Sequence, residues 1–115
     1  MHGARLIMLS AVGLAYAGLS IAAGDPGRGA VVFNGTCIAC HGSDGAGNLP
    51  GVPDLTGRTG LLSQDDAVLF KRMAEGFQSP GSPMAMPPRG GNPALTDADL
   101  RSVLNYMRKE FKIAP

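Results

Sequence analysis

The chain has 115 residues, enough for one domain, and its formal net charge of +1 provides no strongly basic face for nucleic acid. Aromatic residues make up 5% of it and Trp is absent, so few large side chains are available to fill a core. The 17 glycines and 9 prolines indicate long loops.

The chain begins with an apolar segment that differs from the rest. Arg5 precedes residues 6–23, which carry no charge and end in small residues. This pattern is typical of a secretory signal peptide with a small-residue cleavage site at residues 20–22, although the apolar stretch is also just long enough for a membrane anchor. We therefore expect a signal peptide or N-terminal anchor over residues 1–23. Residues 24–115 would form a domain in the periplasm, or facing it from the inner membrane.

The first helix is predicted over residues 26–40. Asp25 followed by Pro26 is typical of a helix N-cap, and apolar side chains recur at helical spacing, with Gly35 as a weak point. Residues 41–60 are instead rich in turn formers, and a bare loop of that length is uncommon in a compact domain. This loop is expected to wrap around a further group.

Two more helices are predicted in the second half of the chain. One covers about residues 64–76, where Ser63 and Asp66 resemble a capping box. The other follows Thr96, which repeats the capping pattern with Asp99 and precedes an apolar stripe with a basic end. The residues between these helices are predicted to be loop, so the pattern has three helices and few strand signals.

Both cysteines lie in the sequence CIACH, as Cys37 and Cys40 directly before His41. On a helical turn the two sulfurs and the imidazole share one side and can address one flat ring, and this spacing is the attachment signature of haem c. The thiols would add to the two vinyl groups, and His41 would ligate the iron.

The same five residues could in principle form a zinc site, a redox-active cysteine pair or a plain disulfide. A structural zinc site lacks a fourth ligand, because the remaining histidine, His2, lies in the expected signal peptide or anchor. A thioredoxin-like redox pair lacks its βαβ context. A plain disulfide leaves the scarce aromatic residues and the long loops unexplained. Covalent haem accounts for both, since the porphyrin would supply the missing core.

With these residues the chain resembles the small class I c-type cytochromes, and most closely the bacterial cytochrome c-five-like group, whose ligand loop reads AMPP-basic-GG, as residues 85–91 do. One departure is that a second cysteine pair, often present in that group, is missing. The resemblance implies an all-α cytochrome c fold, with three main helices packed around one covalently bound haem and long loops.

The resemblance also assigns roles within the first half of the chain. Gly29 would allow the last helix to cross closely, and Phe33 would pack against Val103 and Tyr106 of that helix. Pro53 lies where the family has a proline whose carbonyl accepts a hydrogen bond from Nδ1 of the ligating histidine.

An iron with one histidine ligand needs a sixth ligand, and a neutral thioether suits an electron carrier. Met84 and Met86 lie in a proline- and glycine-rich loop, whereas the other methionines of the domain lie at helical spacing and are expected to fill the core. Pro87 restricts Met86 to an extended backbone. The resemblance selects Met86, directly before the prolines, and leaves Met84 as a packing residue at the haem edge.

The expected function is single-electron transfer by an exported monohaem cytochrome c between periplasmic or membrane redox partners, through the haem edge beside the cysteines. Arg58 and Arg89 are candidates for pairing with the haem propionates. The alternative is the haem c subunit of a larger membrane-associated or periplasmic oxidoreductase. A peroxidase or gas sensor with an open sixth position is disfavoured by Met86.

Overall fold

The computed structural model describes residues 25–111 together with Gly13. The predicted signal peptide or anchor therefore lies, apart from this glycine, outside the described residues. Within residues 25–111, no helix combines the length and hydrophobicity needed to cross a bilayer.

The first helical stretch runs without a break from residue 26 to residue 41, as predicted to within one residue. It consists of α1 (Pro26–Val32), a π-helical turn (Phe33–Cys37) and α2 (Ile38–His41). The Asp25 side chain caps it by accepting a hydrogen bond from the backbone N–H of Gly27 at 2.9 Å. The expected weak point, Gly35, falls inside the π-helical turn. The local sequence pattern therefore located this stretch correctly.

The second predicted helix is α3 (Asp66–Glu75), but its predicted capping box is wrong. Ser63 ends a short 3-10 turn, and the N-cap residue, Asp65, makes no side-chain capping bond. The reason is a long-range contact: Asp66 pairs with Arg108, whose guanidinium also donates to two backbone carbonyls just before α3, at 2.8 Å each. These bonds fasten the start of α3 to the last helix.

The last helix is α4 (Asp97–Glu110), and its predicted capping box is confirmed. The backbone N–H of Asp99 donates to the Thr96 hydroxyl at 3.1 Å, and the Asp99 carboxylate accepts from the Thr96 N–H at 2.9 Å. The same carboxylate accepts from Nε of Arg28 on α1 at 2.7 Å. The bonds from Arg28 and Thr96 hold the pKa of Asp99 well below its usual range.

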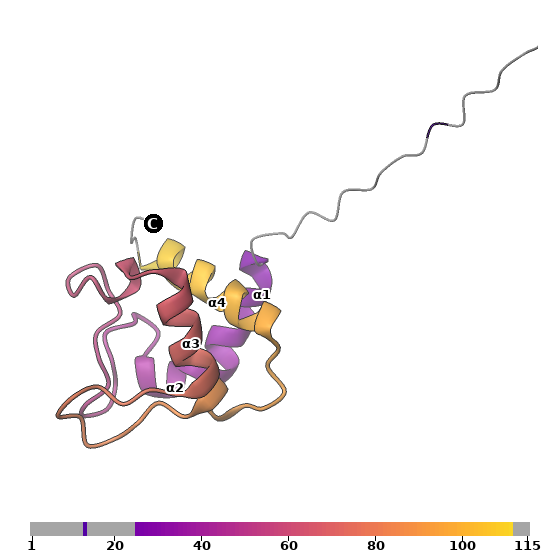
Figure 1. Ribbon diagram of the computed structural model, residues 1–115. Coiled ribbons are helices and arrows are strands. Elements are labelled where there is room, and N and C mark those ends of the chain that lie inside the picture. Colours follow the sequence, from indigo (N-terminus) through magenta and orange to yellow (C-terminus); the bar gives the residue numbers. More distant parts are fainter. Residues whose placement is uncertain (1–12, 14–24, 112–115) are drawn as a thin grey trace, which may run out of the picture.

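The close pairing of α1 with α4 confirms the implied packing (Figure 1). At Gly29, an added Cβ would lie 2.2 Å from the carbonyl oxygen of Ser102, so a side chain has no room there. Phe33 is 1% exposed, and its ring centroid lies 5.7 Å from that of Tyr106 and 5.5 Å from that of Phe111.

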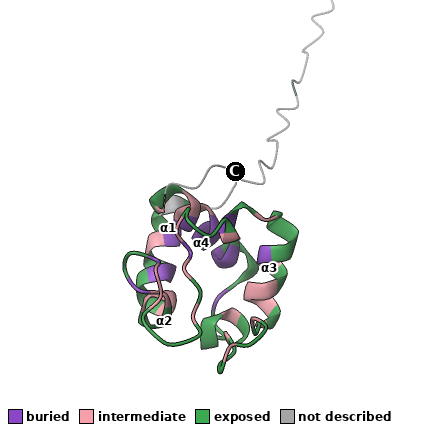
Figure 2. Ribbon diagram, turned by 90° about the vertical axis from the view of Figure 1, so that its left-hand side faces the viewer, coloured by how far each residue is buried: buried purple, intermediate pink, exposed green. Residues whose placement is uncertain are grey.

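Figure 2 shows the buried residues gathered where the helices meet, while the connecting loops are mostly exposed. The fold is all-helical with long loops, as predicted, and the described residues contain no strand longer than an isolated bridge. The helices and loops together surround an apolar pocket.

Candidate functional site

The pocket brings together all five residues that the sequence singled out. Cys37, Cys40, His41, Pro53 and Met86 line it, although Met86 is far from the others in the sequence. The remaining wall combines leucine, valine and methionine side chains of α1, α3 and α4 with residues of the connecting loops. The two methionines predicted as helical core residues, Met73 and Met107, belong to this wall.

The π-helical turn delivers the cysteines and the histidine to the pocket. Its widened hydrogen bond runs from the N–H of Ile38 to the carbonyl of Phe33. The loop after α2 then folds back, so that the backbone N–H groups of residues 47 and 48 donate to the carbonyls of His41 and Cys40, at 2.8 Å each. These bonds satisfy carbonyl groups at the end of α2 and hold the backbone of His41 in place.

Partial burial changes the acid–base properties of these groups. Desolvation, together with the nearby Cys40, raises the pKa of the Cys37 thiol to about 11. Desolvation lowers the pKa of His41, so its imidazole is neutral at pH 7, which is the form that binds metal ions. The pocket thus combines two thiols, a neutral imidazole and a thioether.

The predicted hydrogen bond between His41 and Pro53 is not made. Nδ1 of His41 is buried and has no hydrogen-bond partner among the described residues. The loop is held instead by the bond from the Leu55 N–H to the Gly45 carbonyl at 2.7 Å, which leaves Pro53 on the pocket wall without a bond to Nδ1. The role of Pro53 stays a prediction.

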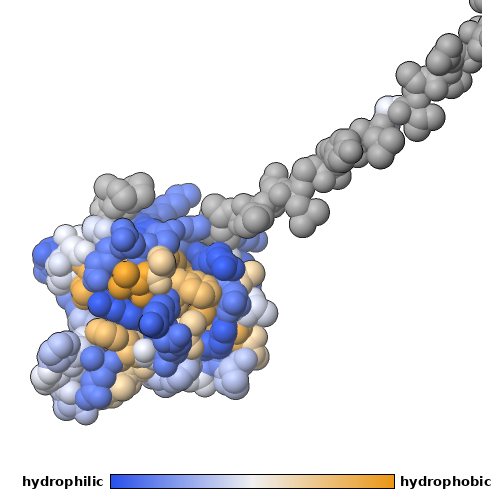
Figure 3. All heavy atoms as spheres, viewed as in Figure 1, coloured by the Kyte–Doolittle hydropathy of each residue, from blue (hydrophilic) through white to orange (hydrophobic). Residues whose placement is uncertain are grey.

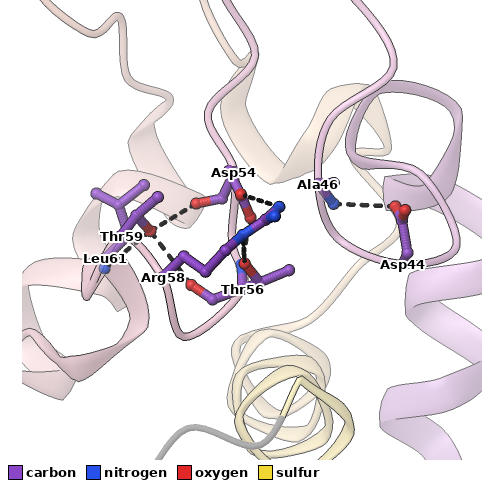
Figure 4. Close-up of polar contacts among 7 residues, drawn as sticks. All are labelled: Asp44, Ala46, Asp54, Thr56, Arg58, Thr59 and Leu61. Atoms are coloured by element: carbon purple, nitrogen blue, oxygen red, sulfur yellow. Dashed lines mark hydrogen bonds and ion pairs between the residues drawn. The ribbon is translucent and has the colours of Figure 1, made fainter.

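Arg58 serves the loop rather than the pocket. Its guanidinium donates to the Asp54 carboxylate at 2.7 Å, and the same carboxylate accepts from the Thr56 N–H at 2.8 Å (Figure 4). The bonds from Thr56 and then Arg58 lower the pKa of Asp54. A separate turn is closed by the Ala46 N–H, which donates to Asp44 at 3.0 Å. Arg58 does not line the pocket, so the structure does not support it as a propionate partner.

Arg89 lines the pocket but is also engaged, since it donates to the Leu95 carbonyl at 2.9 Å and to the Asp97 carboxylate at 2.6 Å. Another arginine of the pocket wall, Arg72, was not predicted from the sequence. Its guanidinium carbon lies 4.1 Å from the ring centroid of Phe77, and no carboxylate of the described residues pairs with it. The sequence offered one signal for this position, because Arg72 follows the buried Leu69 of α3 by three residues and therefore lies on the same side of the helix.

The backbone around Met86 is fixed by a bridge that the sequence did not predict. The Met86 N–H donates to the Phe77 carbonyl at 2.8 Å, and the Phe77 N–H donates to the Met86 carbonyl at 3.0 Å. Gly76 makes this approach possible: its φ is +83°, and an added Cβ would lie 2.8 Å from the Met86 carbonyl oxygen. Met84 also lines the pocket but is 38% exposed and makes no such bridge.

Two loops beside the pocket carry no charged residue. Residues 45–53 and 76–88 contain no Asp, Glu, Lys or Arg, and the Ser82 hydroxyl joins these two loops by donating to the Gly51 carbonyl at 3.0 Å. Phe77 and Met84 expose more than a third of their surface here. On the face seen in Figure 3, apolar side chains reach the surface among hydrophilic ones.

The chain is similar in sequence to known proteins. The cytochrome c family profile matches residues 27–110. The chain is 33% identical over 72 residues to cytochrome c-554(548) of Halomonas halodenitrificans, covering 63% of this chain and 81% of that protein. It is 32% identical over 91 residues to cytochrome c-555 of Prosthecochloris aestuarii, covering 75% and 88%. It is also 37% identical over 81 residues to the cbb3-type cytochrome c oxidase subunit CcoP of Cereibacter sphaeroides, where the match covers 70% of this chain and 26% of the subunit.

Proposed function

Because the chain belongs to the cytochrome c family, we propose that it is a monohaem electron carrier whose haem is attached to Cys37 and Cys40 and ligated by His41 and Met86. The observation that carries this proposal is the meeting of two thiols, a neutral imidazole and a thioether in one apolar pocket. When bound, the haem would supply an iron that gains and loses one electron.

The chain's own residues suit this role because they hold both ligands in fixed positions. The bonds at the end of α2 hold the backbone of His41, and the bridge to Phe77 together with Pro87 restrains Met86. A site whose ligands move little between oxidation states needs little reorganisation. A thioether ligand also favours the reduced iron and keeps the sixth position closed.

Arg72 replaces Arg58 and Arg89 in this proposal as the partner for the haem propionates. Both of those arginines are bound to carboxylates of the protein, whereas Arg72 lines the pocket without one among the described residues. A guanidinium in a largely apolar wall is suited to bind a carboxylate.

The exchange of electrons would occur across the two uncharged loops, residues 45–53 and 76–88. We infer that residues 1–23 direct the chain to the periplasm, as a cleaved signal peptide or as an anchor, and that residues 24–115 form the haem domain. Since these two loops carry no charge, docking of redox proteins against them is expected to depend weakly on ionic strength.

The second candidate function is that of a haem c subunit within a larger oxidoreductase. The likeness to part of a cbb3-type oxidase subunit favours it. Co-purification of the tagged, full chain with other redox subunits from its native membrane or periplasm would support the subunit role. Recovery of the chain alone, in a form that exchanges electrons with added carriers, would support the free carrier.

The haem assignment is tested by expressing the full chain with a haem c attachment system. The mass of the denatured protein should include one haem, and Cys37→Ala with Cys40→Ala should lose it. Met86→Ala should keep the covalent haem but lose the weak far-red absorption band typical of methionine-ligated ferric haem, whereas the control Met84→Ala should keep both. Retention of the band in Met86→Ala would exclude Met86 as the ligand.

A further inference from the structure

The turn that follows the methionine loop has an unusual backbone. Arg89, Gly90 and Gly91 have φ angles of +54°, +63° and +84°, and Arg89 is the non-glycine residue with positive φ within the described part of the chain. This conformation is disfavoured for a residue with a Cβ, so surrounding contacts must hold it. The side chains of this segment provide such contacts.

The Arg89 side chain fastens the turn to the start of α4. One guanidinium nitrogen donates to the Leu95 carbonyl at 2.9 Å, and another donates to the Asp97 carboxylate at 2.6 Å. The side chain is 27% exposed, so these bonds are partly shielded from water. Asp97 is the first residue of α4, which gives the anchor a rigid support.

The Asn92 side chain fastens the same turn to the haem-attachment segment. Its amide oxygen accepts from the Ala94 N–H at 3.1 Å, which fixes the orientation of the amide, and its amide nitrogen donates to the Thr36 hydroxyl at 3.3 Å. Thr36 directly precedes Cys37 and lines the pocket. The backbone of the turn also lies close to the Thr36 side chain, because a Cβ added at Gly90 would lie 2.9 Å from Cγ2 of Thr36.

We propose that Arg89, Asn92 and Thr36 are positioning residues that hold the Met86 loop in place and thereby set how firmly Met86 binds the iron. The inference rests on the proposed ligation by Met86. Two attachments to separate elements restrain the turn, and Pro87 and Pro88 form a stiff link from the turn back to Met86. A weaker attachment would raise the population of states in which the thioether is away from the pocket.

The test uses imidazole as a competing ligand for the ferric holoprotein. Thr36→Val removes the hydroxyl while keeping the shape of the side chain. Arg89→Asn removes the anchor but leaves a residue that tolerates positive φ. Thr36→Val should bind imidazole about three to ten times more tightly than the wild type, the equilibrium equivalent of losing one hydrogen bond. Arg89→Asn, which loses two bonds, should bind imidazole at least as tightly as Thr36→Val.

Two matched controls make the same chemical changes elsewhere. Thr59→Val removes a hydroxyl that donates to the Asp54 carbonyl at 2.7 Å, and Arg28→Asn removes an arginine that pairs with Asp99 in the same first turn of α4. Both controls should lower the stability to denaturant but leave imidazole affinity unchanged. Thr36→Val and Arg89→Asn variants that fold, keep the haem and bind imidazole like the wild type would overturn the positioning role.

The two proposals fail in different ways. If the wild type shows the far-red band and Met86→Ala loses it, ligation by Met86 stands, and wild-type imidazole affinity in the positioning variants then overturns the positioning role alone. If the wild type lacks the band and Met86→Ala binds imidazole with unchanged affinity, the ligand assignment fails, and the positioning role fails with it. Asn92→Ala provides a second removal of the Thr36 contact if Thr36→Val does not fold.

Discussion

Gly29→Ala should disrupt the crossing of α1 and α4 although it adds a single methyl group. The added Cβ would lie 2.2 Å from the carbonyl oxygen of Ser102, 2.6 Å from Cβ of Tyr106 and 2.8 Å from the carbonyl carbon of Ser102. Two of these three atoms belong to the backbone of α4 and cannot move without moving the helix. The helices must therefore separate to accept the new side chain.

Two opposing effects set the magnitude. Alanine favours a helix over glycine by about 1 kcal/mol, which alone would stabilise the variant. Overpacking of a close contact costs about 1 to 3 kcal/mol, and a contact as short as 2.2 Å against backbone places this position at or above the upper end. The free energy of unfolding should therefore fall by about 2 kcal/mol.

The assay is urea unfolding of the holoprotein, with Gly35→Ala as the matched control. A Cβ added at Gly35, in the adjoining π-helical turn, would meet nothing within 4 Å. The control should therefore be as stable as the wild type or more stable by up to about 1 kcal/mol. Equal stability of the Gly29→Ala variant and the wild type would refute the reasoning, because it would mean that the helices do not approach this closely.

Three further predictions concern the loops and the termini of helices. Gly76→Ala combines a φ of +83° with a Cβ 2.8 Å from the Met86 carbonyl oxygen, so it should break the backbone bridge at Met86 and weaken the far-red band in the absorption spectrum. Thr96→Ala removes the N-cap of α4 and should lower the free energy of unfolding by about 1 kcal/mol in urea, while a glycine at this position should cost less. The pKa of Asp54 is lowered in the folded state by bonds from Thr56, so its contribution to stability is present above the unfolded pKa of about 4 and is lost on further acidification. Asp54→Asn should therefore show a smaller loss of stability below about pH 4, as measured by acid titration of the unfolding midpoint.

Features that depend on neighbouring residues in the sequence were predicted well. The bounds of the first helix, the capping box at Thr96 and the helical turn that carries Cys37, Cys40 and His41 all follow from local patterns. The Gly29 contact was also foreseen, but from the resemblance to a family, because no local pattern shows which helix lies against a glycine.

Features that depend on which distant groups meet were missed. The capping box at Ser63 failed because Arg108, 42 residues further along the chain, takes the Asp66 carboxylate. Arg58 and Arg89 looked available in the sequence, yet each finds a carboxylate within eight residues. Which carboxylate an arginine binds depends on the folded geometry of the loops, and the spacing of residues in the sequence says little about that geometry.

The π-helical turn explains how one continuous helix serves both the packing against α4 and the pocket. Each step of four residues on a regular α-helix rotates by about 40°, so the three steps from Gly29 through Phe33 and Cys37 to His41 would turn the last side chain by about 120° away from the first. A π-helical turn contains more residues, because its hydrogen bonds close over five residues instead of four, and it therefore removes part of this rotation. Gly29 and Phe33 can then face α4 while Cys37 and His41 face the pocket that α4 also lines. Gly29, Phe33, Cys37 and His41 are spaced by four residues, and the π-helical turn between them lets this spacing serve both the helix contact and the pocket.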